Sequence, residues 1–239
     1  MEIKPKKVLS EEQYFRKAYR DKYLERNPPK KLQTYLSTIL KYKPRGCLLD
    51  IGCAFGLFVE MASYNFEAEG IDISSYTIGI AKERAPKCRF YVSDILKFTS
   101  KKKYDVITSF DTLEHIPELD KSLKKIKSLL NEKGILALVI PVYDGPLGQI
   151  VKLLDHDPTH IHLFTREQWI EKMKEYRFRI LFYEGHLRYL LLNRRYIFYR
   201  TKLLRKWMPA IFLVCEPRRL KQKEEIMKKS KKIFKKGKR

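Results

Sequence analysis

Short apolar segments alternate with helix-like segments between residues 47 and 141, and this alternation limits what the chain can fold into. Buried strands that alternate with helices at such a spacing form a largely parallel sheet with helices on both faces. The sequence therefore predicts an α/β fold. The apolar segments are CLLDIG, EAEGIDI, RFYVSDI, YDVITSF and ILALVIP, and the helix-like segments between them are 56–64, 75–85 and 118–131.

The flanking segments complete the expected organisation. Residues 1–43 form two helix-like stretches separated by Asn27-Pro28-Pro29, and we expect them to be an N-terminal helical lid. Residues 44–186 form the core; after a loop-like insert, Thr165 caps a helix and RILFYEG follows as a strand. With AIFLVCE in residues 209–217 as the final strand, the sheet has seven strands.

Residues 187–208 separate these last two strands, and their apolar side chains follow a helical period. We expect a basic amphipathic helical insert here, and a basic C-terminal tail at 218–239. The apolar side chains that share one helical face are Leu192, Tyr196, Tyr199, Leu203 and Trp207.

The charge is distributed unevenly. The formal net charge is +23, and the last 52 residues contain 19 basic and 3 acidic side chains, so the C-terminal region needs an anionic partner or many counterions. Abundant Lys, Arg and Glu would also suit a thermophile. The four scattered cysteines and the absence of an apolar leader favour a cytoplasmic location, free or peripheral to a membrane.

Acidic residues occur near the ends of three successive apolar segments. Asp50 precedes the small residues Gly52 and Gly56, Asp72 ends EAEGIDI, and Asp94 lies in VSDI. Ligands of an open parallel sheet bind beyond the carboxyl ends of its strands, so we expect the three acids to share one site. The glycine turn admits a carboxylate, Asp72 can accept from ribose hydroxyls, and Asp94 can meet a purine amino group. A glycine turn alone would also be common for structural reasons.

These segments, continued by YDVITSFDTLEHIPE, resemble the successive motifs of class I S-adenosylmethionine (SAM)-dependent methyltransferases. The resemblance is closest to the small-molecule branch that includes quinone-pathway enzymes, and it covers about residues 35–185. It implies a Rossmann-like fold, SAM as cofactor and a small-molecule acceptor. The cofactor-binding residues that it implies are Asp50, Gly52, Cys53, Ala54, Gly56, Asp72, Ile73, Asp94, Ile95, Ser109 and Phe110. Ala54 replaces the family's middle glycine, although alanine disfavours positive φ.

Two other activities for this fold are less well supported. A nicotinamide-dependent reductase would need closely packed glycines for a pyrophosphate, whereas Phe55 and Phe58 occupy that space. A binding protein without enzymatic activity would not need the SAM motifs that are present here.

Methyl transfer to a hydroxyl requires alignment and a base that removes the proton. We expect His115, Asp111 and His160 to be the catalytic candidates, with Glu114 and His162 as alternatives. The His-x-His pattern and nearby acids of the insert also fit a metal site, but they can equally order a loop, and we expect no metal.

The basic C-terminal region leaves two partners open. A basic helix with an apolar face suits an anionic membrane surface and a lipid-linked acceptor, or its apolar face packs within the protein. The alternative is an RNA methyltransferase that holds phosphates with this region. The Asp/Asn-Pro-Pro-aromatic motif of base methyltransferases is absent from the sequence, which favours the small-molecule acceptor.

Overall fold

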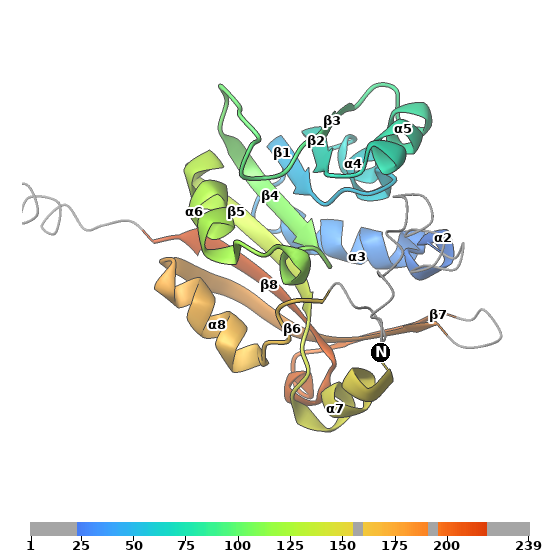
Figure 1. Ribbon diagram of the computed structural model, residues 1–239, viewed down its shortest axis with the longest axis vertical. Helices are drawn as coiled ribbons and strands as arrows, with labels where there is room; N and C mark the ends of the chain where they lie inside the picture. The colour runs from blue at the N-terminus through green and yellow to red at the C-terminus, as the bar shows by residue number, and fades with distance from the viewer. Residues whose placement is uncertain (1–22, 155–159, 191–195, 219–239) are drawn as a thin grey trace, which may run out of the picture.

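The computed structural model describes residues 23–154, 160–190 and 196–218. Their strands form one sheet in the order β3-β2-β1-β4-β5-β8-β6-β7 (Figure 1). β1 to β5 are parallel, whereas β8 is antiparallel to β5 and β6, and β7 is antiparallel to β6. The strands are β1 (Gly46–Ile51), β2 (Phe66–Asp72), β3 (Arg89–Val92), β4 (Tyr104–Phe110), β5 (Leu130–Pro141), β6 (Phe178–Leu190), β7 (Tyr196–Thr201) and β8 (Ala210–Pro217).

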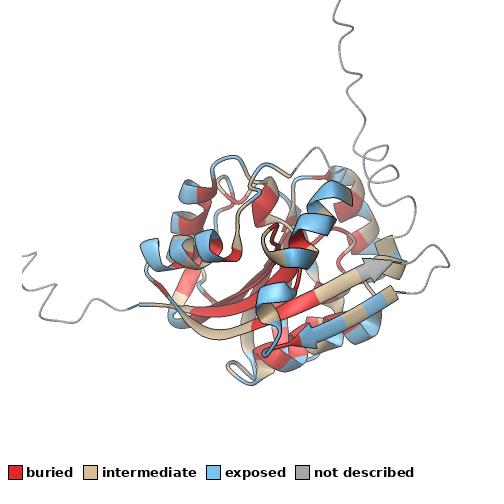
Figure 2. Ribbon diagram, turned by 90° about the horizontal axis from the view of Figure 1, so that it is seen from below, coloured by how far each residue is buried: buried red, intermediate tan, exposed pale blue. Residues whose placement is uncertain are grey.

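Helices cover both faces of the sheet, as the alternation of apolar segments predicts. One apolar cluster contains Leu123 and Trp169 from α6 and α8, and the other contains Tyr35, Val59 and Ile78 from α3, α4 and α5. The burial pattern follows these layers, with the interior of the sheet buried on both sides (Figure 2). The helices are α2 (Tyr23–Arg26), α3 (Pro29–Leu40), α4 (Leu57–Ala62), α5 (Ser75–Arg84), α6 (Leu119–Leu129), α7 (Gly145–Leu154) and α8 (Arg166–Glu175), with 3₁₀ turns η1 (Leu113–His115) and η2 (Arg205–Trp207).

The Rossmann-like architecture is confirmed, but the number of strands is wrong. The described residues form eight strands instead of seven, because the expected helical insert at 187–208 is largely a β-hairpin followed by η2. β6 continues to Leu190 and pairs with β7 from Gly185↔Thr201 to Leu190↔Tyr196. Aromatic and β-branched residues dominate β7, and such side chains favour a strand. Tyr196 and Tyr199, which were expected to share a helical face with Leu203, lie in β7, and Leu203 lies in the turn after it.

The segments around the core agree only partly with expectation. Thr165 does cap α8 in a capping box with Gln168, and α3 begins at Pro29 directly after Pro28, as expected of a helix start. The insert after Pro141 contains α7 instead of being loop-like throughout. Most of the first expected helix, the acids and His156 of the insert, and the tail from 219 lie outside the described residues. No helix in the described part of the chain is long and apolar enough to cross a membrane.

Candidate functional site

The reversal of strand order places the candidate site. The chain runs outward through β2 and β3, then returns to add β4 on the other side of β1, so the crevice between β1 and β4 is the switch point. Ile51 pairs with Ser109 at the carboxyl ends of these two strands. The three acids predicted to share this edge lie in β1, at the end of β2, and two residues beyond β3.

Asp50 is the most deeply buried of these acids, with 4% of its surface exposed. Thr108 Oγ1 on β4 donates a 2.6 Å hydrogen bond to its Oδ1 atom. Burial nevertheless raises the pKa of Asp50 to about 7, against the lowering effect of the Thr108 hydrogen bond. A cationic or hydrogen-bond-donating ligand group would stabilise its ionised form.

The turn between β1 and α4 adopts left-handed backbone at three positions. Gly52, Ala54 and Gly56 have φ of 74°, 44° and 73°. Ala54, which replaces the family's middle glycine, therefore adopts the left-handed conformation that alanine disfavours. Asp72 supports the turn, because its Oδ2 atom accepts the Ala54 N–H at 2.9 Å and its Oδ1 atom accepts the Ser74 N–H at 3.0 Å.

The predicted adenine end lies at the ends of β2 and β3. Asp94 is partly buried and accepts the Leu96 N–H at 2.8 Å, whereas Ile95 is buried in the core beneath it. Ile73, directly after Asp72, is 73% exposed. An exposed isoleucine beside an acid offers an apolar surface next to a hydrogen-bond acceptor.

A cavity of about 40 Å³ lies at the switch point, and α2 and α3 form part of its wall. Asp50, Gly52 and Cys53 line it, together with Phe110 and Asp111. This volume accommodates a few water molecules but not a nucleoside. The remaining lining residues are Tyr23, Asn27, Lys31, Leu32, Tyr35, Leu57 and Phe58.

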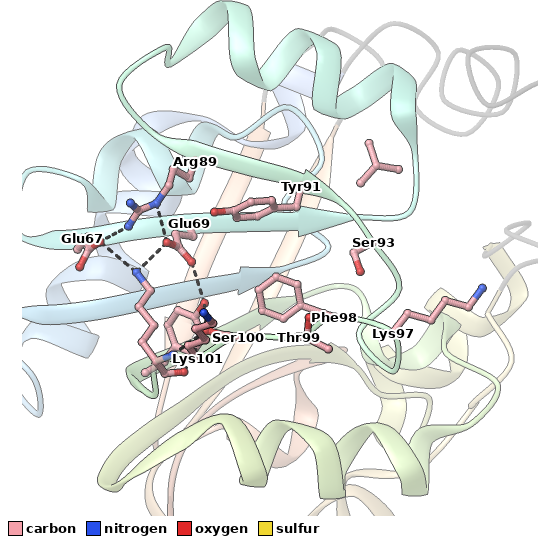
Figure 3. Close-up of a pocket in the computed structure, with 13 residues that line it drawn as sticks. Glu67, Glu69, Arg89, Tyr91, Ser93, Lys97, Phe98, Thr99, Ser100 and Lys101 are labelled. Carbon is pink, nitrogen blue, oxygen red and sulfur yellow. Dashed lines mark hydrogen bonds and ion pairs between the residues drawn. The ribbon is translucent and has the colours of Figure 1, made fainter.

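A larger groove of about 650 Å³ lies beside the edge strand β3 and does not include the three acids (Figure 3). An ion-pair network crosses its floor, where Glu69 accepts from Arg89 Nε and from the Tyr104 hydroxyl, each at 2.7 Å. These groups satisfy one another. We therefore place the site at the smaller cavity, which Asp50 and the glycine turn line and where Asp72 bonds that turn; Asp94 does not line this cavity.

Two cations near this cavity were not predicted from the sequence: Lys31 lines the cavity, and Arg188 pairs with Asp111, which also lines it. Lys31 on α3 is 4% exposed, and burial together with the Arg188 charge lowers its pKa to about 7. Arg188 on β6 pairs with Asp111, whose backbone is left-handed at φ 52°. Among the described residues, the Asp111 Oδ1 and Arg188 Nε atoms are buried without a hydrogen-bond partner.

A pattern in the sequence indicates each of these two cations. Lys31 lies four residues before Tyr35 on the buried stripe of α3, which is an unusual place for a lysine. Glu184, His186 and Arg188 alternate along β6, and period-two polar residues indicate one face of a strand. His186 stacks on Tyr35 with ring centroids 5.6 Å apart, so this face of β6 meets α3.

The catalytic candidates His115 and His160 do lie together, with ring centroids 4.6 Å apart. Glu114 beside them is fully buried, and neither of its carboxylate oxygens has a hydrogen-bond partner in the described part of the chain. Burial and the nearby Asp111 charge raise the pKa of Glu114 to about 8.

Asp111 differs from these groups, because Arg188 lowers its pKa against the effect of burial. His162 donates from Nε2 to the Ile116 carbonyl at 2.8 Å, which occupies that nitrogen. Among the described residues, Glu114, His115 and His160 could hold a metal ion, since their ligand atoms lie within 4.8 Å of one another.

Comparisons with known proteins agree with this arrangement. A family model described as "Methyltransferase domain" matches residues 19–181. A ubiquinone biosynthesis O-methyltransferase of Pelagibacter ubique is 36% identical over 96 residues, covering 37% of this chain and 39% of that protein. The match thus spans about two fifths of the relative.

Solved structures share the fold. A SAM-dependent methyltransferase from Clostridium acetobutylicum has a TM-score of 0.64 at 16% identity, covering 85% of this chain and 97% of that one. Magnesium protoporphyrin IX methyltransferase from Synechocystis, solved with S-adenosylhomocysteine (SAH), has a TM-score of 0.61 at 16% identity, covering 86% and 96%. With its strand order, glycine turn and family match, the chain belongs to the methyltransferase-domain family and has a class I SAM-dependent methyltransferase domain.

Proposed function

We propose that the chain transfers a methyl group from SAM to a hydroxyl group of a small, lipid-linked acceptor. The observation that carries this proposal is the convergence of Asp50, Asp72 and the glycine turn at the switch point. The named activity of the relatives, O-methylation in ubiquinone biosynthesis, supports an oxygen acceptor and a lipid tail.

The residues present fit the chemical groups of SAM. Its methionine end is a zwitterion, and the cavity is lined by one buried acid and one buried lysine, Asp50 and Lys31. Asp50 would accept from the ammonium group and Lys31 would donate to the carboxylate. Each contact would also restore the ordinary charge of a group whose pKa burial shifts toward 7.

The nucleoside would extend from there along the strand ends. Asp72 would accept from the ribose hydroxyls while it continues to hold the turn through Ala54 N. The exposed Ile73 side chain would contact the adenine face, and Asp94 with Ile95 would lie at its edge. Ser109 and Phe110 end β4 beside β1, and we expect them to lie by the reacting methyl group.

The cavity is too small for the cofactor unless the N-terminal helices move. Tyr23 of α2 packs edge-on against Phe55 of the glycine turn, with centroids 4.6 Å apart, and also lines the cavity. Displacement of α2 would open the crevice, and its return would exclude water from the reaction. Residues 23–43 would then act as the inner part of a lid.

SAM supplies an electrophilic methyl group on a sulfonium, and the chain must align a hydroxyl and accept its proton. His115 is the best-placed base, since its Nε2 atom lies 4.0 Å from Glu114 Oε1 and its ring lies beside His160. Formation of the imidazolium would favour ionisation of Glu114, whose pKa burial raises to about 8, and the carboxylate would then stabilise the imidazolium. Asp111 is the poorest base of the group because Arg188 stabilises its charge, so it would orient the acceptor instead.

Transfer of labelled methyl groups tests this function. The full chain is incubated with methyl-labelled SAM and separate fractions of lipids, water-soluble metabolites and RNA. We expect label in the lipid fraction, base-stable as for an ether, and a large loss of turnover in His115→Gln with SAM affinity unchanged. Label only in RNA, or only in water-soluble metabolites, would contradict the proposed acceptor.

A further inference from the structure

Exposed apolar side chains occur on α7. This helix follows the carboxyl end of β5 and lies away from α2 and α3 (Figure 1). Pro146, Ile150 and Leu153 are exposed and are spaced by four and three residues, so they share one face of the helix. Ile150 is 53% exposed and Leu153 is 79% exposed. A helix normally buries such a face, so this one is available to a partner.

The segment between β7 and β8 adds further apolar side chains. Leu203 is 91% exposed, Leu204 46% and Trp207 55%. They lie in and just before η2, which packs against α7: a side-chain carbon placed on Gly145 would come within 2.6 Å of the Lys206 carbonyl oxygen. The two elements therefore form one continuous surface.

A buried arginine holds this surface together. Arg166, at the start of α8, is 2% exposed and pairs with Asp144, which directly precedes α7. Its guanidinium also donates to the main-chain carbonyls of Asp144, Arg205 and Met208, at the ends of α7 and η2. Because one fixed side chain bonds both segments, the exposed apolar residues stand on a rigid support.

The two segments that carry these residues are basic, and the neighbouring Asp144 is paired with Arg166. Residues 145–154 and 196–209 contain five basic side chains and no acidic one. Lys152, Lys202 and Lys206 are exposed beside the apolar side chains. We call the six apolar residues and these three lysines the apolar–basic patch.

We infer that the apolar–basic patch docks the protein on the surface of an anionic lipid bilayer. Aliphatic and tryptophan side chains that insert at the headgroup level, with lysines around them, are the chemistry that anionic lipid selects. Two copies of this chain would bring like charges together at the patch. RNA would use the lysines but would leave Leu153 and Leu203 in water, so it accounts for only half of the surface.

Tryptophan fluorescence gives a direct test, because Trp169 is fully buried and Trp207 is 55% exposed. The full chain is titrated with vesicles of phosphatidylcholine alone and of phosphatidylcholine with phosphatidylglycerol. We expect co-flotation and a blue shift of the emission with the anionic vesicles only, and quenching of Trp207 by lipids brominated near the headgroup. Co-flotation without a blue shift would mean adsorption by other basic segments and would overturn the inference.

Two matched substitutions distinguish binding through the apolar–basic patch from binding through the overall positive charge of the protein. Leu203→Glu should lower vesicle affinity at least tenfold and abolish the shift. Tyr64→Glu makes the same charge change at a side chain that is 87% exposed in the turn before β2, and it should have little effect. Equal losses in both variants, or binding of RNA by a chain that ignores vesicles, would contradict the inference. Because Leu203→Glu should keep its affinity for SAM, this outcome is independent of the proposed methyl transfer.

Discussion

Replacement of Asp50 by asparagine should stabilise the protein while weakening its binding of SAM. The amide would keep the shape of the side chain and its hydrogen bond from Thr108, but a buried carboxylate would be removed. Burial raises the pKa of Asp50 from 3.8 to about 7, so the folded state resists its ionisation. For an acid with a raised pKa, the destabilisation grows as pH rises from the unfolded value toward the folded one.

The size of this effect follows from the difference in pKa. About three units at 1.36 kcal/mol each give roughly 4 kcal/mol of destabilisation at pH 8, against roughly 2 kcal/mol at pH 5. The Asp50→Asn protein should therefore be more stable than the wild type, by an amount that is larger at pH 8. The loss of a charge-assisted hydrogen bond to an ammonium should cost about 1.5–3 kcal/mol of SAM affinity.

Urea unfolding without SAM, at pH 5 and pH 8, measures the first effect, and calorimetric titration with SAM measures the second. Asp94→Asn is the control for the unfolding measurements, because Asp94 is only partly buried. A free energy of unfolding that is lowered by Asp50→Asn, or changed equally at both pH values, would refute the argument that Asp50 is a strained buried acid.

Three further predictions concern the same region. The affinity for SAM, measured by calorimetry, should pass through a maximum near pH 7, because Asp50 must be ionised and Lys31 protonated. Lys31→Met should remove the decrease in affinity above pH 7. Ala54→Gly should raise the free energy of unfolding by roughly 0.5–1 kcal/mol by relieving a φ of 44°, and an unchanged urea midpoint would contradict this. Arg188→Met should destabilise the chain by about 2–3 kcal/mol by leaving Asp111 without its cation, and adding Asp111→Asn should recover at least half of that loss.

The parallel core could be predicted because its information is local. Each strand from β1 to β5 contains a short, mostly apolar run, and the positions of Asp50, Asp72 and Asp94 follow from where those runs end. Connections between such strands have few topologies, so local pattern is enough to bring the acids to one edge.

The β6–β7 hairpin could not be predicted in the same way. Its pairing, such as Arg188↔Phe198, is decided by the whole sheet, which offers β6 the free side of β8. A helical period fitted the apolar residues of 187–208 equally well, and that choice concealed Arg188 as a neighbour of Asp111. Lys31 was missed because its burial depends partly on Tyr196 of β7, whose ring lies 5.7 Å from its Nζ atom and which is far away in sequence.

The central claim is that the acids at the strand ends hold one SAM molecule, and calorimetric titration of the wild type and of Asp72→Ala tests it most directly. We predict one saturable site for SAM on the wild type, no binding of a nicotinamide cofactor, and an affinity lower by about 1–3 kcal/mol in a folded Asp72→Ala protein. A wild-type chain that does not bind SAM, or an Asp72→Ala protein that binds it equally well, would contradict the account.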